Sequence, residues 1–162
     1  MNLNLYDEFW FKVKIQSAKR VHGIACQILY PPDILEAVLD DSGSVKVQPG
    51  TFLSQNNTLT MLNAWLEDDK PGKIIVGLNK MGEAPESAGA GSLFDVLFRC
   101  VGVGQGDIRF SQAQIYDTAI QAEPSQWTSA SVQVTGINIV SVDIVPRSIT
   151  RREIDVTLQI EG

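Results

Sequence analysis

The sequence predicts an all-β fold, a sandwich or a barrel, and the prediction rests on a few observations. Apolar and polar residues alternate with a period of two along many short segments, which is the pattern of half-buried strands. Turn-forming sequences such as DDSGS, EDDKPGK and GVGQGD separate these segments. Apolar residues do not recur at helical spacing in any window of about a dozen residues. Many short strands joined by such turns are typical of β-sandwiches and barrels.

The first two strands are predicted at residues 9–16 and 23–30. Each carries an unbroken apolar row on one face, which we expect to point into the core. These rows are Phe9, Phe11, Val13 and Ile15 in the first strand and Ile24, Cys26, Ile28 and Tyr30 in the second.

Two prolines, Pro31 and Pro32, follow the second strand and end its pairing because they lack backbone donors. Asp33 is then expected to cap a single helical turn. We expect Ile34 and Leu35 to close one end of the core.

Further strands are predicted along the rest of the chain, separated by the turn signals. They cover residues 59–66, 73–79, 93–101, 108–110, 131–134, 139–144 and 154–160. Residues 81–92 are rich in small and polar side chains, which offer little to bury, and are predicted to form a surface loop.

Length and composition favour one globular domain, and the charge and apolar runs argue against a nucleic-acid partner and a membrane-spanning helix. The 162 residues can bury one sizeable core, and 44% hydrophobic with 20% charged residues is an ordinary folded composition. The formal net charge of −6 argues against a nucleic-acid partner, which requires basic clusters. No apolar run approaches the roughly 20 residues of a membrane-spanning helix, and the first residues lack the pattern of a signal peptide.

The sequence offers no catalytic or metal-binding constellation. His22 is the only histidine and is expected to be an ordinary surface residue before a strand, which excludes histidine-rich zinc sites. Cys26 and Cys100 lie on apolar rows and are predicted to be free core thiols, while a disulfide between facing sheets stays an alternative. The acidic residues 67–69 could collect calcium, but the Lys-Pro-Gly turn that follows is a sufficient explanation.

The glycines of GVGQGD, residues 102–107, are predicted to make a tight turn. A phosphate-binding loop would need a helix behind it, whereas a strand follows here. We therefore predict that the chain is not an enzyme and holds no cofactor or metal.

A surface remains as the candidate site. The outward rows of strands 23–30, 59–66 and 73–79 show Leu29, Trp65 and Ile75 to solvent if these strands are neighbours. Contiguous exposed apolar groups that include a tryptophan are typical of protein interfaces. The alternative is that one row is assigned to the wrong side, which would move Trp65 into the core. The predicted partner-binding residues are Ala25, Gln27, Leu29, Asn63, Trp65, Lys73, Ile75, Gly77 and Asn79.

Four segments follow one another in an order that is similar to a known family. They are YDEFWFKVKI, HGIACQILYPPDILEAV, PGKIIVGLN and GSLFDVLFRCVGVGQGDIRFSQAQIYD. Within them, Tyr30, Pro32, Leu35 and Glu36 match a Tyr-x-Pro-x-x-Leu-Glu motif, Ile74, Val76 and Leu78 an aliphatic strand, and Gly91 and Leu93 a Gly-x-Leu start of a long strand. Over residues 7–136 the chain resembles the cohesin domain.

The chain departs from that family in several places. Tyr6-Asp7 stands where the family has Gly-Asp, and Pro31 replaces a usual aspartate. The family's opening strand is expected to be missing, because residues 1–5 are too short for it and its turn. Residues 140–160 resemble that missing strand and the next one. We therefore predict a cohesin-like sandwich at residues 1–136, and at 137–162 an extra strand pair that begins a following module or packs onto the sandwich.

The resemblance implies a jelly-roll sandwich of about nine strands that lies outside the cell or on its surface, as part of a larger secreted protein. It implies binding of dockerins, small calcium-loaded helical modules, on one open sheet face. That face would be built from strands 23–30, 59–66 and 73–79, with a contribution near 108–110. Any calcium would then belong to the partner.

Two alternatives to dockerin binding stay open. A carbohydrate-binding module could stack sugars on Trp10, Trp65 and Trp127, and would need two or more of them on one face or rim. A structural spacer would need no site, and polar or covered outward faces would favour it.

Overall fold

The computed structural model describes residues 2–136, 138–146 and 154–161 of the chain. Strands dominate the described residues, and helical structure is limited to two short 3-10 turns. The strands are β1 (Asn2–Asn4), β2 (Glu8–Val21), β3 (Gly23–Leu29), β4 (Leu35–Ala37), β5 (Val47–Pro49), β6 (Thr60–Leu66), β7 (Lys73–Lys80), β8 (Ser87–Cys100), β9 (Gly104–Tyr116), β10 (Ala122–Glu123), β11 (Ala130–Thr135), β12 (Asn138–Pro146) and β13 (Ile154–Glu161), and the turns are η1 (Gln55–Asn57) and η2 (Glu67–Asp69).

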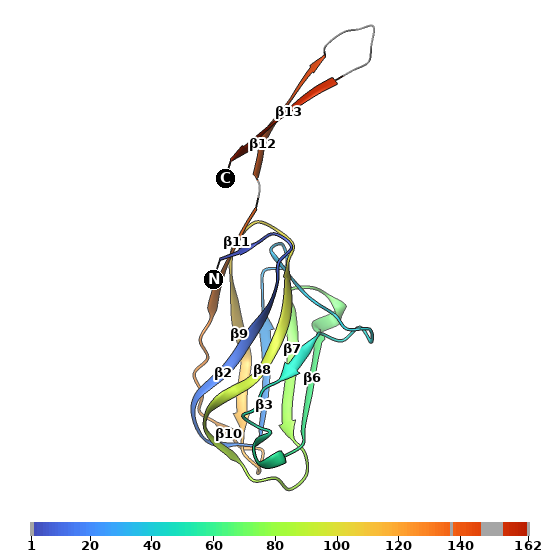
Figure 1. Cartoon of the computed structure of the whole chain (residues 1–162). Coiled ribbons are helices and arrows are strands. Elements are labelled where there is room, and N and C mark those ends of the chain that lie inside the picture. The colour runs from blue at the N-terminus through green and yellow to red at the C-terminus, as the bar shows by residue number, and fades with distance from the viewer. Residues whose placement is uncertain (1, 137, 147–153, 162) are drawn as a thin grey trace.

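Two sheets face each other and form a sandwich (Figure 1). The larger sheet has the order β1-β11-β9-β3-β7-β6, with β10 paired to β9. The smaller sheet has the order β2-β8-β4, with β5 paired to β8. This arrangement confirms the predicted all-β sandwich.

The core lies between the sheets and is built from the apolar rows that alternation predicts. Val13, Ile24, Ile28 and Phe98 are all buried, and the Phe98 ring contacts that of Phe9 at 5.8 Å between centroids. Each large apolar side chain removed from water in this way contributes about 1.5–3 kcal/mol. The opposite rows of the same strands face outward, so the core fixes which residues can form a binding surface.

The double proline is followed by a turn that runs directly into a strand. The Leu35 N–H donates to the Pro31 carbonyl at 2.9 Å, and β4 begins at Leu35. Leu35 is buried, as expected for a residue that closes the core. Asp33 forms no side-chain hydrogen bond with the described residues, so the expected cap is absent there.

The GVGQGD segment begins in the short connection between β8 and β9, as predicted, and its glycines also lie against the proline turn. A Cβ at Gly102 would lie 2.0 Å from the Asp33 carbonyl oxygen. A Cβ at Gly106 would lie 2.6 Å from Pro31 Cγ. Both distances are far below van der Waals contact, so only glycine lets β9 approach the proline turn.

The predicted surface loop at 81–92 is wrong over its second half. β8 begins at Ser87, and Ser87 is buried with its hydroxyl donating to the Phe52 carbonyl at 2.8 Å. A Cβ at Gly91 would lie 3.0 Å from the Phe52 ring. The small residues of this stretch therefore accommodate Phe52, and only residues 81–86 form the loop.

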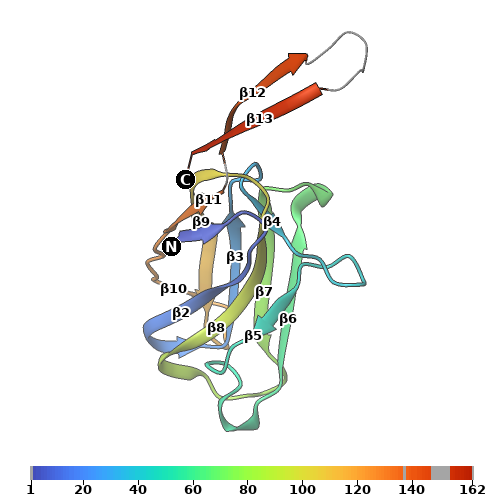
Figure 2. The ribbon, with the colours of Figure 1, turned by 45° about the horizontal axis from the view of Figure 1, so that its top comes forward.

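The ends of the chain add two features. An opening strand is present, contrary to expectation, because β1 pairs in parallel with β11 from Asn2 opposite Gln133 to Asn4 opposite Thr135. β12 and β13 pair antiparallel with each other as a separate two-stranded sheet, and they lie beyond the end of the sandwich (Figure 2). This hairpin occupies the region where an extra strand pair was predicted, and whether it begins a following module or packs onto the sandwich stays a prediction.

Candidate protein-binding face

The outward side of β3, β7 and β6 forms the candidate face. β7 lies between the other two strands in antiparallel register. Ile75 of β7 therefore stands directly opposite Trp65 of β6 and Gln27 of β3. Leu29 is opposite Lys73 in the neighbouring row. Residues directly opposite on one face have Cβ atoms about 5 Å apart, so these side chains form one continuous surface.

A second, more polar row lies further along the same strands. Gly77 stands opposite Ala25 on one side and Asn63 on the other. Asn79 follows, opposite Met61. The structure thus brings every predicted partner-binding residue onto one face, and their part in binding stays a prediction.

The exposures of these residues show apolar side chains at the centre of the face, among mostly polar ones. Trp65 is 47% exposed, although a large aromatic side chain is usually mostly buried. Ile75 and Leu29 are half-buried, and Asn63 and Asn79 are exposed. Trp65 therefore does not lie in the core, and the alternative row assignment is wrong.

β9 adds polar residues to this face that alternation along β9 did not reveal. Arg109, Ser111 and Gln114 lie opposite Leu29, Gln27 and Ala25 of β3. The register shifts between Ala25 and Gln27, where β9 carries an extra residue.

That extra residue, Gln112, has a positive φ of 45°. Its side-chain oxygen accepts a hydrogen bond from Gln27 Nε2 at 2.9 Å. A bulge of this kind breaks the period of two, which is why the sequence predicted only residues 108–110 as a strand here.

Charges on the face are few and mostly paired. Lys73 Nζ lies 2.7 Å from a Glu67 carboxylate oxygen, and Arg109 Nε lies 3.9 Å from that of Asp107. Exposed pairs of this kind contribute little to stability, about 0–1 kcal/mol, so they are free to rearrange toward a partner. The surrounding amides of Gln27 and Asn63 can both donate and accept hydrogen bonds.

The tryptophans do not gather on one surface. Trp65 lies on the candidate face, whereas Trp10 belongs to β2 in the other sheet. The Trp127 ring packs against Phe110 at 4.9 Å between centroids, at the edge of the sandwich. A sugar-stacking platform with two tryptophans on one face is therefore not formed by the described residues.

Thiols do not pair and metal ligands do not gather in the described part of the chain. Cys26 and Cys100 are free and buried, and burial raises the pKa of the Cys26 thiol to about 12. No group of three or more His, Cys, Asp and Glu side chains is placed to hold a metal ion. No described helix is long and apolar enough to cross a membrane.

Solved structures share this architecture. A non-cellulosomal cohesin from the hyperthermophilic archaeon Archaeoglobus fulgidus is similar with a TM-score of 0.62 and 22% identity, over 83% of this chain and 85% of that one. A type II cohesin domain from the cellulosome of Acetivibrio cellulolyticus gives 0.63 and 16%, over 81% and 88%. The chain has the cohesin fold. This confirms the predicted resemblance at the level of the fold.

The cohesin fold also appears in complexes. A type I cohesin–dockerin complex from Clostridium thermocellum contains a chain similar to this one with a TM-score of 0.62 and 13% identity, over 83% of this chain and 88% of that one. No family model and no curated protein matches the sequence. The cohesin fold of this chain is thus shown by the similarity of the backbone, since the sequence identities are low.

Proposed function

We propose that this chain is a non-catalytic protein-binding module that receives a dockerin-type partner on the outward face of β3, β7 and β6. The observation that carries the proposal is the row Gln27–Ile75–Trp65, in which the exposed Trp65 and the half-buried Ile75 form an apolar centre beside a polar amide. Solved structures of this fold include complexes with dockerins from Acetivibrio cellulolyticus and Clostridium thermocellum.

Binding would follow from the chemistry of this face. Trp65, Ile75 and Leu29 would lose contact with water in the centre of the interface, where tryptophan is enriched among the residues that dominate affinity. Gln27 and Gln112 already bond to each other across β3 and β9, so their amides are held in place for a partner's polar groups. Preorganised groups lose less conformational entropy on binding.

The partner and the location follow from the same proposal. Calcium would be bound by the dockerin-type module and not by this chain, so chelation should abolish binding through the partner. A module of this kind would work outside the cell or on its surface, as part of a larger secreted protein.

The test is a calorimetric titration of the full chain with calcium-loaded type I and type II dockerins, repeated with Trp65→Ala. We expect Trp65→Ala to raise the dissociation constant at least about tenfold, a loss of binding free energy on the order of 1.4 kcal/mol, because a central aromatic contact is lost. The matched control is Trp10→Ala, which removes the same side chain from the other sheet and should leave affinity unchanged. Equal affinities of wild type and Trp65→Ala, or no binding to either dockerin type, would contradict the proposal.

A further inference from the structure

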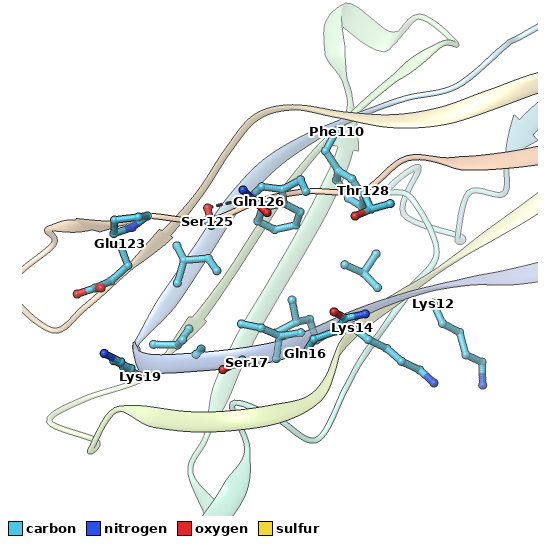
Figure 3. A pocket seen from close by; sticks show the side chains of 18 of the residues that line it. Lys12, Lys14, Gln16, Ser17, Lys19, Phe110, Glu123, Ser125, Gln126 and Thr128 are labelled. Carbon is cyan, nitrogen blue, oxygen red and sulfur yellow. Dashed lines mark hydrogen bonds between the residues drawn. The ribbon is translucent and has the colours of Figure 1, made fainter.

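An open groove runs along the edge of the sandwich, away from the candidate face. One wall is formed by residues 11–21 of β2 and the other by residues 123–130 (Figure 3). The cavity has a volume of about 680 Å³. We call it the edge groove. Phe11, Ile15, Phe110 and Trp127 line it and are only half-buried, although they pack on the core. The hydrophobic core is therefore open to solvent along this edge.

The backbone on both walls of the edge groove lacks strand partners. Within the described chain, β2 pairs only with β8, so its other side presents free N–H and C=O groups. Residues 124–128 belong to no strand and form no backbone hydrogen bond with the described residues. Free strand edges are templates for pairing with another segment.

β1 shows which direction a strand in the edge groove would take. It pairs in parallel with β11 at one end of the groove. The turn at residues 4–7, where the Asp7 N–H donates to the Asn4 carbonyl at 3.1 Å, then sends the chain back as β2. A strand that continues the line of β1 beside residues 124–130 would run parallel to them and antiparallel to β2.

We propose that the edge groove accepts β13 of a second copy of this chain as an added strand. The sequence of β13 alternates Ile154, Val156, Leu158 and Ile160 with polar residues. An inserted β13 could place this apolar row against the exposed core and the other row toward solvent. β12 is a poorer candidate, because its register with β13 is irregular between Ile139 and Ser141 and it ends in Pro146.

Charge favours the same strand. The groove wall of β2 carries three lysines, Lys12, Lys14 and Lys19 (Figure 3). All three are exposed, and none has an ion-pair partner among the described residues. The polar row of β13 contains Asp155 and Glu161 and no basic residue. Opposite charges on neighbouring strands are stabilising.

The position of the hairpin favours a second copy over the same chain. β12 and β13 leave the sandwich after β11 and pair only with each other among the described residues (Figure 1). A two-stranded sheet alone is marginally stable in water. β13 would exchange its one-sided pairing with β12 for pairing on both edges and apolar burial in the groove. Exchange of an identical element between copies is a common route to association.

The experiment measures the mass of the full chain by light scattering over a wide dilution series. We expect concentration-dependent self-association, and we expect Leu158→Asp to weaken it at least about tenfold, because an aspartate would enter the apolar groove. The matched control is Gln159→Asp, which adds the same charge on the row that faces solvent and should preserve association. Hydrogen exchange of the β2 amides that do not bond to β8 should slow as concentration rises.

A second measurement separates loss of the groove contact from loss of the hairpin. The full-length Leu158→Asp chain should bind a synthetic peptide of residues 153–162, and Lys14→Glu added to that chain should weaken the binding. A wild-type chain that stays monomeric at all concentrations overturns the proposal. So does concentration-independent protection of the β2 amides that point away from β8 into the groove, since that result indicates insertion of the chain's own tail.

Discussion

Glu86 joins three segments at one end of the sandwich. Its carboxylate accepts hydrogen bonds from the Arg20 guanidinium at 3.0 and 3.3 Å and from the N–H and hydroxyl of Thr118, both at 3.0 Å. The hydrogen bond from Arg20, followed by that from the Thr118 backbone, lowers the pKa of Glu86 from 4.5 to about 2. Arg20 also reaches the buried Asp117 at 3.0 Å, so β2, the loop after β7 and the segment after β9 are held together here.

The lowered pKa of Glu86 gives a prediction about acid stability. A carboxylate whose pKa is lower in the folded state stabilises the fold above its unfolded pKa, and this stabilisation is lost as the pH falls toward the folded value. The melting temperature of wild type should therefore exceed that of Glu86→Gln at neutral pH, and the difference should disappear between about pH 4.5 and 2.

Glu83→Gln is the matched control for this series, because Glu83 lies in the same loop, is exposed and forms no ion pair with the described residues. Melting followed by circular dichroism at a series of pH values measures the effect. A constant difference between wild type and Glu86→Gln at every pH would contradict the assigned role.

Among the elements, the proline turn packs closely against the segment that leads into β9, and this packing requires glycine. Gly102 meets the backbone of Asp33, and this contact has no flexible side chain that could move aside. The contact holds the turn before β4 against the connection between β8 and β9, at one end of the core. Gly104 and Gly106 lie against Ile34 and Pro31 of the same turn.

Gly102→Ala is expected to lower the free energy of unfolding by about 1–3 kcal/mol, because an added methyl group would force the proline turn outward. Gly77→Ala is the control, since a Cβ there meets nothing within 4 Å, and its effect should stay within about 0.5 kcal/mol. Urea titration followed by tryptophan fluorescence compares the two variants. Equal stabilities of Gly102→Ala and wild type would show that the turn does not pack as described.

Strands that arise from a local alternating pattern could be predicted from the sequence. Strands that depend on a bulge or on a distant partner could not. β6 and β7 contain no bulge and β3 contains none between Ile24 and Leu29, so a period of two assigned their rows, and the exposure of Trp65 decided the one row that the sequence left open. β9 contains the bulge at Gln112, which stops the period in the middle of a strand. β1 forms by parallel pairing with a segment more than a hundred residues away, and no local pattern reports such a partner.

At the scale of the whole molecule, one sandwich presents two separate surfaces. The candidate face lies on the larger sheet over β3, β7 and β6, and the edge groove lies where β2 has no second neighbour. Alternation predicted the residues of the face because they oppose the core on each strand. It could not place the strands side by side, and only the resemblance to cohesins supplied that order. The edge groove was not predicted, because it depends on which strand remains unpaired.

The most direct test of the candidate face is to map which backbone amides are covered when a calcium-loaded dockerin binds, by NMR cross-saturation on the labelled full chain. Binding on this face predicts transfer to amides of β3, β6 and β7, strongest around Ile75 and Trp65 and extending to Gln112. Transfer to β2 and β8 instead, with the β7 amides unaffected, would contradict the assignment of the binding face.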